Sequence, residues 1–382
     1  MLKGSLQIKK NNKYYVYVRI DGKQKAIPTG IEAVRGSKRR AEAKMIEILA
    51  ELDDNPHIYD KVLFVDYAMK WLEYNQKQVD IITFTANKKQ LEQHIIPYFK
   101  PLKLYLQNVK ASDIEGYYNH KAVTGRMDGK PGGLSKGSLK RHCSVMSCIF
   151  NMALHDDLIK KNPCEHAKLP NIETVPQEIN IYTAEQCKRL LEVTKGELFH
   201  DMVYITFIYG LRRSELMGLR WRDVDFENNT ITISHTAVAT GIMVRKDKTK
   251  TSSSHRTYPL LDDIRDMLLD IKNQQTHYKA IFGNGYTDTG YVFTKEDGTA
   301  YYPDYPTKKL KKVIKKFDLP YIKFHELRKS CVTMLIEKGW NMKDVSDWVG
   351  HSDISVTMNI YAQVTMSRKR ELADGLTGTL LQ

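Results

Sequence analysis

The chain begins with short runs of β-favouring residues that are separated by polar turn residues. The three runs are Leu6–Lys9, Tyr14–Ile20 and Lys23–Ile27. Asn11-Asn12 and Asp21-Gly22 supply the turns between them, and Asp-Gly is a strong hairpin signal. A basic helix is expected from Ser37 to Leu52, with Ser37 as its N-cap. The pattern predicts a small three-stranded sheet plus one helix, followed by a linker at Asp53–Pro56.

Apolar residues recur at helical spacing in the next stretch, first at Val62, Val65, Met69 and Leu72. Four helices are expected, at Val62–Gln76, Thr85–Ile96, Ala111–His120 and Ser135–His155. Pro97 is expected to stop the second helix, since proline lacks an N–H. The three prolines between Pro163 and Pro176 mark the end of this helical domain.

From residue 178 onward the chain mixes helix and strand patterns. Helices are expected at Ala184–Thr194, with Thr183 as its cap, at Asp262–Ile281 and at Thr307–Phe317, and a short one ends at Leu219. The segment Asp201–Tyr209 is apolar and is expected to be buried. Strands are expected at Thr230–Ser234, Thr236–Thr240 and Met243–Arg245. The chain is therefore expected to be a multidomain α+β protein. Its parts are a sheet plus helix (1–55), a helical domain (60–170) and a mixed, mainly α domain (178–382).

Composition points to a polyanionic partner. The 382 residues carry a formal net charge of +14, and the isoelectric point is about 9.3. Such an excess favours nucleic acid first and a membrane surface second. No apolar run is long enough to span a bilayer, and the N-terminus lacks the apolar core of a signal peptide. Five cysteines without a C-x-x-C pair are expected to be reduced thiols in a cytoplasmic protein.

Two basic groups are candidates for DNA contact. One lies on the predicted sheet, and its members include Lys9, Lys10, Lys13, Arg19, Lys23 and Lys25. The other opens the fourth predicted helix, at Lys136, Lys140 and Arg141. A small sheet can enter a DNA groove, and basic helix ends can hold the sugar-phosphate backbone. The alternative for both is an ordinary solvated surface.

Candidate chemistry concentrates between Lys323 and Val364. His325 and Arg328 are three residues apart and share one face of a helix. Arginine matches a phosphate with its planar fork, so this pair suits a phosphodiester. Tyr361 is the only tyrosine in the stretch, and a tyrosine hydroxyl can form a covalent intermediate.

Further candidates lie upstream. Arg212 follows a segment that is expected to be buried, where a charge needs a partner such as Glu215. Either the two residues form a purely structural ion pair, or Glu215 holds the Arg212 guanidinium in place to bind a phosphate. Lys250 opens KTSSSHRTYPL at a polar hairpin tip, where it enters a groove, acts as an acid or is simply a solvated loop lysine.

Four stretches, in this order, resemble the tyrosine recombinases of the phage integrase family: GLRRSEL, KTSSSHRTYPL, HELR and GHSDISVTMNIYAQV. They run from Gly210 to Val364. The layout of the two upstream domains resembles the integrases of temperate phages and conjugative transposons. In those proteins a sheet binds arm-type DNA sites and a helical domain binds core sites, so the last domain is expected to have the tyrosine-recombinase fold.

The resemblance implies a role for each matching residue. The family's catalytic positions fall on Arg212, Lys250, His325, Arg328, His351 and the nucleophile Tyr361, with Glu215 at the acidic supporting position. The two arginines would clamp the phosphate, His325 would act as base, Lys250 as acid, and His351 as a hydrogen-bond donor. The product would be a 3′-phosphotyrosine and a free 5′-hydroxyl, and no metal, cofactor or ATP is implied.

The expected activity is site-specific recombination that integrates and excises a mobile element. The expected partners are core and arm-type duplex DNA and further copies of the chain, as a tetramer on DNA. An excisionase and a host DNA-bending protein are further candidates. The apolar tail Thr365–Gln382 is hypothesised to dock on a neighbouring subunit. Three alternatives stay open: a type IB topoisomerase, a non-catalytic DNA-binding regulator and a metal-dependent nuclease.

Overall fold

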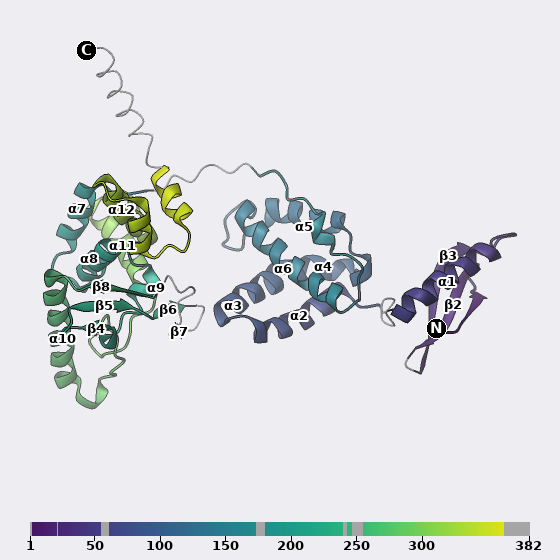
Figure 1. Cartoon of the computed structure of the whole chain (residues 1–382), viewed down its shortest axis with the longest axis horizontal. Helices are drawn as coiled ribbons and strands as arrows, with labels where there is room; N and C mark the ends of the chain where they lie inside the picture. The colour runs from purple at the N-terminus through teal and green to yellow at the C-terminus, as the bar shows by residue number, and fades with distance from the viewer. Residues whose placement is uncertain are drawn as a thin grey trace, which may run out of the picture. The chain divides into compact units, whose positions relative to one another are not determined.

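The structure is a computed structural model that describes residues 2–20, 22–54, 61–172, 180–239, 243–246 and 255–362. The chain divides into two compact units, Met1–Pro176 and Gln177–Gln382 (Figure 1). Four predicted features lie wholly or partly outside the described residues: the turn residue Asp21, Asn55-Pro56 of the predicted linker, Lys250 and the tail Thr365–Gln382. The further division of the first unit near residue 60 remains a prediction.

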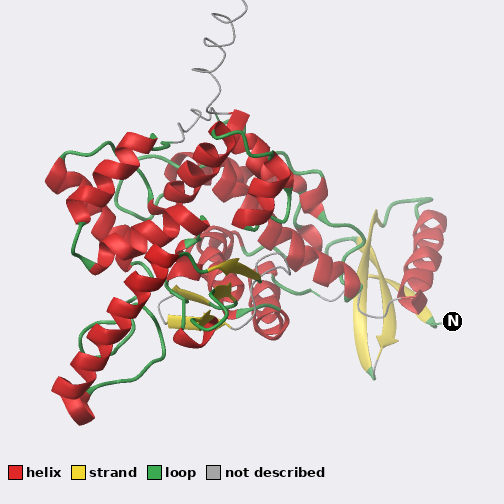
Figure 2. Ribbon diagram, turned by 60° about the vertical axis from the view of Figure 1, so that its left-hand side comes forward, coloured by secondary structure: helices red, strands yellow, loops and turns green. Residues whose placement is uncertain are grey.

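The N-terminal sheet is antiparallel in the order β1-β2-β3, with bounds Gly4–Ile8, Lys13–Ile20 and Lys23–Glu32. Helix α1 (Lys38–Asp54) packs beside it (Figure 2). Along β2, Val16, Val18 and Ile20 are buried against Ile48 and Leu52 of α1, because alternate side chains of a strand share a face. Ser37 precedes the helix as expected, and its hydroxyl bonds the preceding turn: it accepts from the Val34 N–H at 3.0 Å and donates to the Val34 carbonyl at 2.7 Å.

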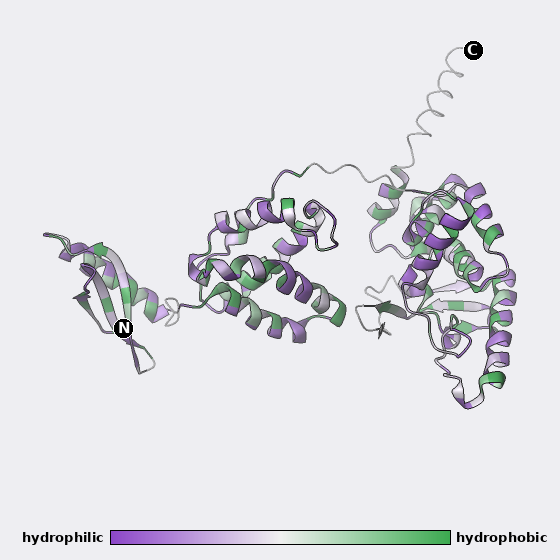
Figure 3. Ribbon diagram, turned by 180° about the vertical axis from the view of Figure 1, so that it is seen from behind, coloured by the Kyte–Doolittle hydropathy of each residue, from purple (hydrophilic) through white to green (hydrophobic). Residues whose placement is uncertain are grey.

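The helical domain comprises α2 (Phe64–Gln78), α3 (Ile81–Gln90), α4 (Ile96–Phe99), α5 (Ala111–Thr124) and α6 (Lys136–His155). Hydrophobic and hydrophilic residues alternate along these helices (Figure 3), and their apolar faces form one core that includes Phe64, Phe99, Tyr117 and Phe150. The fourth predicted helix, Ser135–His155, is confirmed as α6, and the Ser135 hydroxyl caps it by accepting from the Ser138 N–H at 3.3 Å.

The second predicted helix has different bounds in the structure. It begins at Ile81, because the Asp80 carboxylate accepts from the N–H groups of Ile82 and Thr83 at 2.8 and 3.1 Å. The sequence did not predict this start, because the β-branched residues that follow Asp80 favour strands. Pro97 does not stop the helix either: a wider turn at Leu91–Ile95 precedes it and α4 continues beyond it. Widened turns are a known way to accommodate a break in the helical hydrogen bonds.

The second unit is mixed but mainly helical. Its helices are α7 (Ala184–Thr194), α8 (Leu198–Tyr209), α9 (Arg213–Leu216), α10 (Asp262–Phe282), α11 (Tyr305–Phe317), α12 (Phe324–Glu337), α13 (Met342–Val349) and a last one over 354–362. A three-stranded sheet has the order β4-β5-β8, with bounds Val224–Asp225, Thr230–Ile233 and Arg256–Pro259. A separate hairpin pairs β6 (Thr236–Ala239) with β7 (Met243–Lys246). These observations confirm the multidomain α+β class.

One expectation for the second unit is confirmed, and one element was not predicted. The apolar segment Asp201–Tyr209 is largely buried, as expected, and forms most of helix α8. Strand β8 at Arg256–Pro259, which pairs with β5, was not predicted. That pairing is long-range, so the local sequence did not reveal it. Among the described residues, no helix is both long and apolar enough to cross a membrane.

A buried histidine is expected to make the helical domain sensitive to acid. His142 of α6 is 4% exposed, and its Nδ1 lies 2.7 Å from the Tyr117 hydroxyl. Burial, together with the charges of His94, Lys121 and Arg141, lowers the pKa of His142 to about 4. The unfolded chain therefore takes up a proton near pH 6.5, where the folded chain does not, and stability is lost as the pH falls from about 6.5 towards 4.

We expect the helical domain to be about 2 kcal/mol less stable at pH 5 than at pH 7.5 through His142. The measurement is the urea dependence of hydrogen exchange in peptides of α6 at the two pH values. His142→Gln should weaken the pH dependence. The control is His155→Gln at the end of the same helix, where the histidine side chain is 90% exposed. This substitution should leave the pH dependence unchanged. Equal pH dependence in both variants would contradict the assignment.

Candidate active site

The turn after α8 brings two distant helices together. Gly210 ends α8 with φ +57°, a left-handed conformation that favours glycine. A Cβ at this position would lie 2.6 Å from Val349 Cγ1 of α13. The Gly210 carbonyl accepts a hydrogen bond from Arg328 Nη1 of α12 at 2.7 Å. The backbone at Gly210 thus lies in close contact with both α12 and α13, and it holds these helices against the end of α8.

Arg212 and Glu215 form the predicted pair at the start of α9. The Arg212 N–H donates to Glu215 Oε2 at 2.9 Å, and its Nη1 donates to Oε1 at 2.6 Å. Its Nη2 donates to the Gly350 carbonyl at 2.9 Å, which fixes the guanidinium from two sides. The side chain is still 33% exposed, so an oriented cation faces solvent.

Arg328 is the most deeply buried cation of this group. The residue is 1% exposed, and its buried Nη2 has no hydrogen-bond partner in the structure. Burial and the neighbouring charge of Arg212 lower the pKa of Arg328 to about 9. The guanidinium remains protonated at neutral pH. A buried donor without a partner is costly, so the Nη2 group is suited to an incoming anion.

A pocket of about 260 Å³ opens beside Arg328, and its lining includes His325, Lys329, His351 and Asn359. His351 Nδ1 lies 2.8 Å from Thr357 Oγ1. Burial and then the charges of Arg328 and Arg212 lower the pKa of His351 to about 3. Burial and the positive charges of Arg328, Lys329 and Arg212 lower the pKa of His325 as well. Both imidazoles are therefore uncharged at neutral pH.

Tyr361 lies at the end of the last described helix, over 354–362. Its ring is half-buried and packs against an apolar cluster that includes Cys331, Val332 and Ile360. Ile360 also lines the pocket, so the candidate nucleophile follows a pocket residue directly. Of the predicted catalytic residues, the structure brings together Arg212, Glu215, His325, Arg328 and His351.

One residue of this site was missed by sequence reasoning. Arg256 of β8 is bound to Glu215: its Nη2 lies 2.8 Å from Oε2 and its Nη1 lies 3.2 Å from Oε1. Burial alone would raise the pKa of Glu215, but Arg256 and Arg212 outweigh it and lower that pKa to about 2. The only local signal was an arginine two residues before Tyr258 in a β-favouring run.

The predicted DNA-contact residues lie on exposed parts of the first unit. Lys9, Lys10, Arg19 and Lys23 are exposed around the sheet, and Lys140 and Arg141 are exposed near the start of α6, whereas Lys136 is half-buried. Lys9 Nζ lies 4.2 Å from the centre of the Tyr15 ring and 5.7 Å from that of Tyr17. Sequence reasoning treated these tyrosines only as strand formers, whereas they lie beside a predicted DNA-contact lysine.

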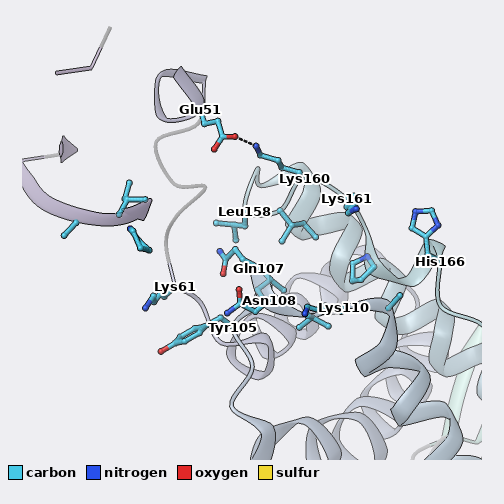
Figure 4. Close-up of a pocket in the computed structure, with 18 residues that line it drawn as sticks. Glu51, Lys61, Tyr105, Gln107, Asn108, Lys110, Leu158, Lys160, Lys161 and His166 are labelled. Carbon is cyan, nitrogen blue, oxygen red and sulfur yellow. Dashed lines mark hydrogen bonds and ion pairs between the residues drawn. The ribbon is translucent and has the colours of Figure 1, made fainter. Parts of the chain in front are cut away.

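A second pocket lies within the first unit (Figure 4). Basic side chains in its lining are Lys61, Lys110, Lys160, Lys161 and His166, and Lys160 forms an ion pair with Glu51. None of the residues predicted for catalysis or DNA contact lines it. Among the described residues, no three His, Cys, Asp or Glu side chains are grouped as metal ligands.

Arg328 and two uncharged histidines line one small pocket, and Arg212 is held by Glu215 and by Gly350, the residue before His351. This arrangement suits a phosphodiester. Comparisons with known proteins agree. The model of the phage integrase family matches residues 180–368, and that of the phage integrase N-terminal SAM-like domain matches residues 63–122. A tyrosine recombinase XerC-like protein of Caldanaerobacter subterraneus is 30% identical in an alignment that covers 98% of this chain and 99% of that protein.

Solved structures share the fold. The Tn1549 transposon integrase in complex with transposon right-end DNA has a TM-score of 0.64 at 23% identity, over 83% of this chain and all of that chain. A lambda integrase tetramer bound to a Holliday junction has a TM-score of 0.60 at 14% identity, over 93% of this chain and 94% of that one. The chain belongs to the phage integrase family and is a tyrosine site-specific recombinase.

Proposed function

We propose that this recombinase uses Tyr361 to cut and rejoin DNA strands. The Tyr361 hydroxyl attacks the scissile phosphorus and passes its proton to His325, the P–O5′ bond breaks, and the 5′-oxygen takes a proton from Lys250. The bond energy is kept in a 3′-phosphotyrosine. A 5′-hydroxyl of another strand then attacks this ester and releases the tyrosine.

The observation that carries this proposal is the unpartnered Nη2 of Arg328 beside the pocket that His325 and His351 line. Negative charge grows on the non-bridging oxygens in the transition state, and fixed cations stabilise it without reorganisation. The fork of Arg212 is already oriented by Glu215 and Gly350. A neutral His325 can accept a proton. In the His351 tautomer whose Nδ1 accepts from the Thr357 hydroxyl, Nε2 carries a proton that it can donate to the phosphate.

The test is a covalent-adduct assay. The full chain is mixed in EDTA with duplexes from the ends of its element, each nicked near the suspected cut so that the released strand diffuses away. A slower band on a denaturing gel, with a phosphotyrosine peptide at Tyr361 by mass spectrometry, is the expected result. An adduct that requires divalent metal, or cleavage with no adduct, would contradict the mechanism.

The same proposal covers the partners. The substrate is duplex DNA with core and arm-type sites, and the working assembly is a tetramer. The lambda integrase tetramer on a Holliday junction shares the fold and supports this arrangement. We place the activity in the cytoplasm, with integration and excision of a phage or conjugative element. An excisionase and a host DNA-bending protein are proposed as further partners.

The exposed basic residues of the N-terminal sheet are proposed to bind the arm-type site. Changing Lys9 and Arg19 together to alanine should weaken arm-site binding and reduce the slope of log K against log salt by about 2, since each lost phosphate contact removes about 0.9. Fluorescence anisotropy at several salt concentrations measures this slope, and core-site binding should be unchanged. The matched control is Lys44→Ala on α1, which removes a lysine that is paired with Glu47 and whose side chain is 43% exposed. An unchanged slope in the double variant would contradict the proposal.

A further inference from the structure

Three guanidinium groups surround the single carboxylate of Glu215. Arg256 holds it with two hydrogen bonds, Arg212 holds it with one from its side chain and one from its backbone, and Arg328 Nη1 lies 3.9 Å from Oε2. Glu215 is 2% exposed, so water screens none of these interactions effectively. The balance of charge among these four residues therefore determines where each guanidinium rests.

We infer that Arg256 is a positioning residue of the recombination reaction, one that neutralises Glu215 so that Arg212 and Arg328 remain available to the phosphate. The inference rests on the proposed use of those two arginines as the phosphate clamp. Without Arg256, the buried negative charge would be balanced by the clamp itself. Each clamp guanidinium would then be drawn toward Glu215 and away from the DNA.

The placement of Arg256 fits this role and not that of a substrate ligand. Its side chain is only 9% exposed and does not line the pocket, whereas Arg328 lines the pocket and the side chain of Arg212 is 33% exposed. The geometry with Glu215 is that of a fork on a carboxylate, with one nitrogen opposite each oxygen. Arg256 thus engages both carboxylate oxygens and sets the side from which Arg212 can approach.

Arg256 also connects the carboxylate to the segment that carries His351. Its Nε donates to the Tyr258 hydroxyl, which in turn donates to the Trp348 carbonyl in α13. The Tyr258 ring packs edge-on against Trp348, with 4.8 Å between ring centres. The Arg212 Nη2 bond to the Gly350 carbonyl meets the same segment from the other side. Glu215, β8 and the turn before His351 therefore form one continuous polar network.

The test separates the cleavage rate constant from DNA binding and from folding. Wild type, Arg256→Gln and Arg256→Lys are mixed in excess with the nicked duplex, and adduct formation is followed over time. We expect Arg256→Gln to lower the first-order rate constant about 30-fold to 100-fold, with an unchanged dissociation constant for the DNA. Arg256→Lys keeps the charge and should lose clearly less. Arg189→Gln, an exposed surface arginine on α7 paired with Glu192, is the matched control and should behave as wild type.

A double variant distinguishes charge balance from a merely structural role. Glu215→Gln combined with Arg256→Gln removes both charges, so the clamp is no longer drawn inward, and the rate constant should recover at least about fivefold over Arg256→Gln alone. Three results would overturn the inference: a normal rate constant with only a smaller reacting fraction in Arg256→Gln, no recovery in the double variant, or Lys and Gln variants that are equally slow. A wild-type chain that forms no adduct would instead refute the proposed function itself.

Discussion

Tyr361→Phe is expected to abolish the covalent adduct, with a loss of at least about a thousandfold in the rate of strand cleavage. The substitution removes one oxygen, the atom that attacks phosphorus. The ring itself packs against the cluster around Cys331 and Val332, and phenylalanine keeps that packing. DNA binding should therefore stay close to that of wild type while the chemistry is lost.

The matched control is Tyr321→Phe, a tyrosine of the same unit that is 52% exposed. It should form adduct at the wild-type rate. A duplex labelled at the 5′ end of the cut strand should carry its label into the adduct, because the protein is joined to the 3′-phosphate. An adduct that survived in Tyr361→Phe would show that another side chain is the nucleophile.

Arg328→Ala is expected to slow strand cleavage by about 10²-fold to 10³-fold, as for loss of a fixed donor to transition-state charge. The guanidinium is buried, and its Nη2 has no partner other than the proposed phosphate. The reduction should appear in the first-order rate constant of adduct formation at saturating enzyme. The change also leaves the Gly210 carbonyl without its donor, at a stability cost of about 1–3 kcal/mol.

Two variants separate this effect from a general loss of charge. Arg328→Lys keeps one positive charge but lacks the fork, so it should fall between wild type and Arg328→Ala. Arg189→Ala on the exposed face of α7 removes the same side chain away from the pocket and should leave the rate unchanged. The measurement is made below the melting temperature of each variant. Equal rates for Arg328→Ala and wild type would exclude Arg328 from the clamp.

The sequence determined much of this protein by local rules. Helical spacing predicted α6 and α7 within a residue, and Thr183 caps α7 as expected. Both helices carry strong periodic patterns and polar cap residues, so neighbouring residues suffice to define them. The catalytic candidates were also found from the sequence, since four matching stretches in order specify a family. The role of each residue in catalysis remains a prediction.

Local information failed where distant segments compete with propensity. The start of α3 at Ile81 lies in a β-branched run that only the Asp80 cap and the packing of the bundle make helical. Strand β8 forms because it pairs with β5, and the residues next to Arg256 in the sequence do not predict this pairing. Propensities are worth tenths of a kcal/mol per residue, so long-range pairing and burial outweigh them.

The tertiary structure alone decided the electrostatics of the site. The sequence paired Glu215 with Arg212, but the fold adds Arg256 and Arg328 around the same carboxylate. The fold also buries Arg328 so that its Nη2 donor has no hydrogen-bond partner, and burial together with nearby charges lowers the pKa of His351 to about 3. Burial and distance fix the strength of charge interactions, and both arise only when helices and strands far apart in the chain pack together.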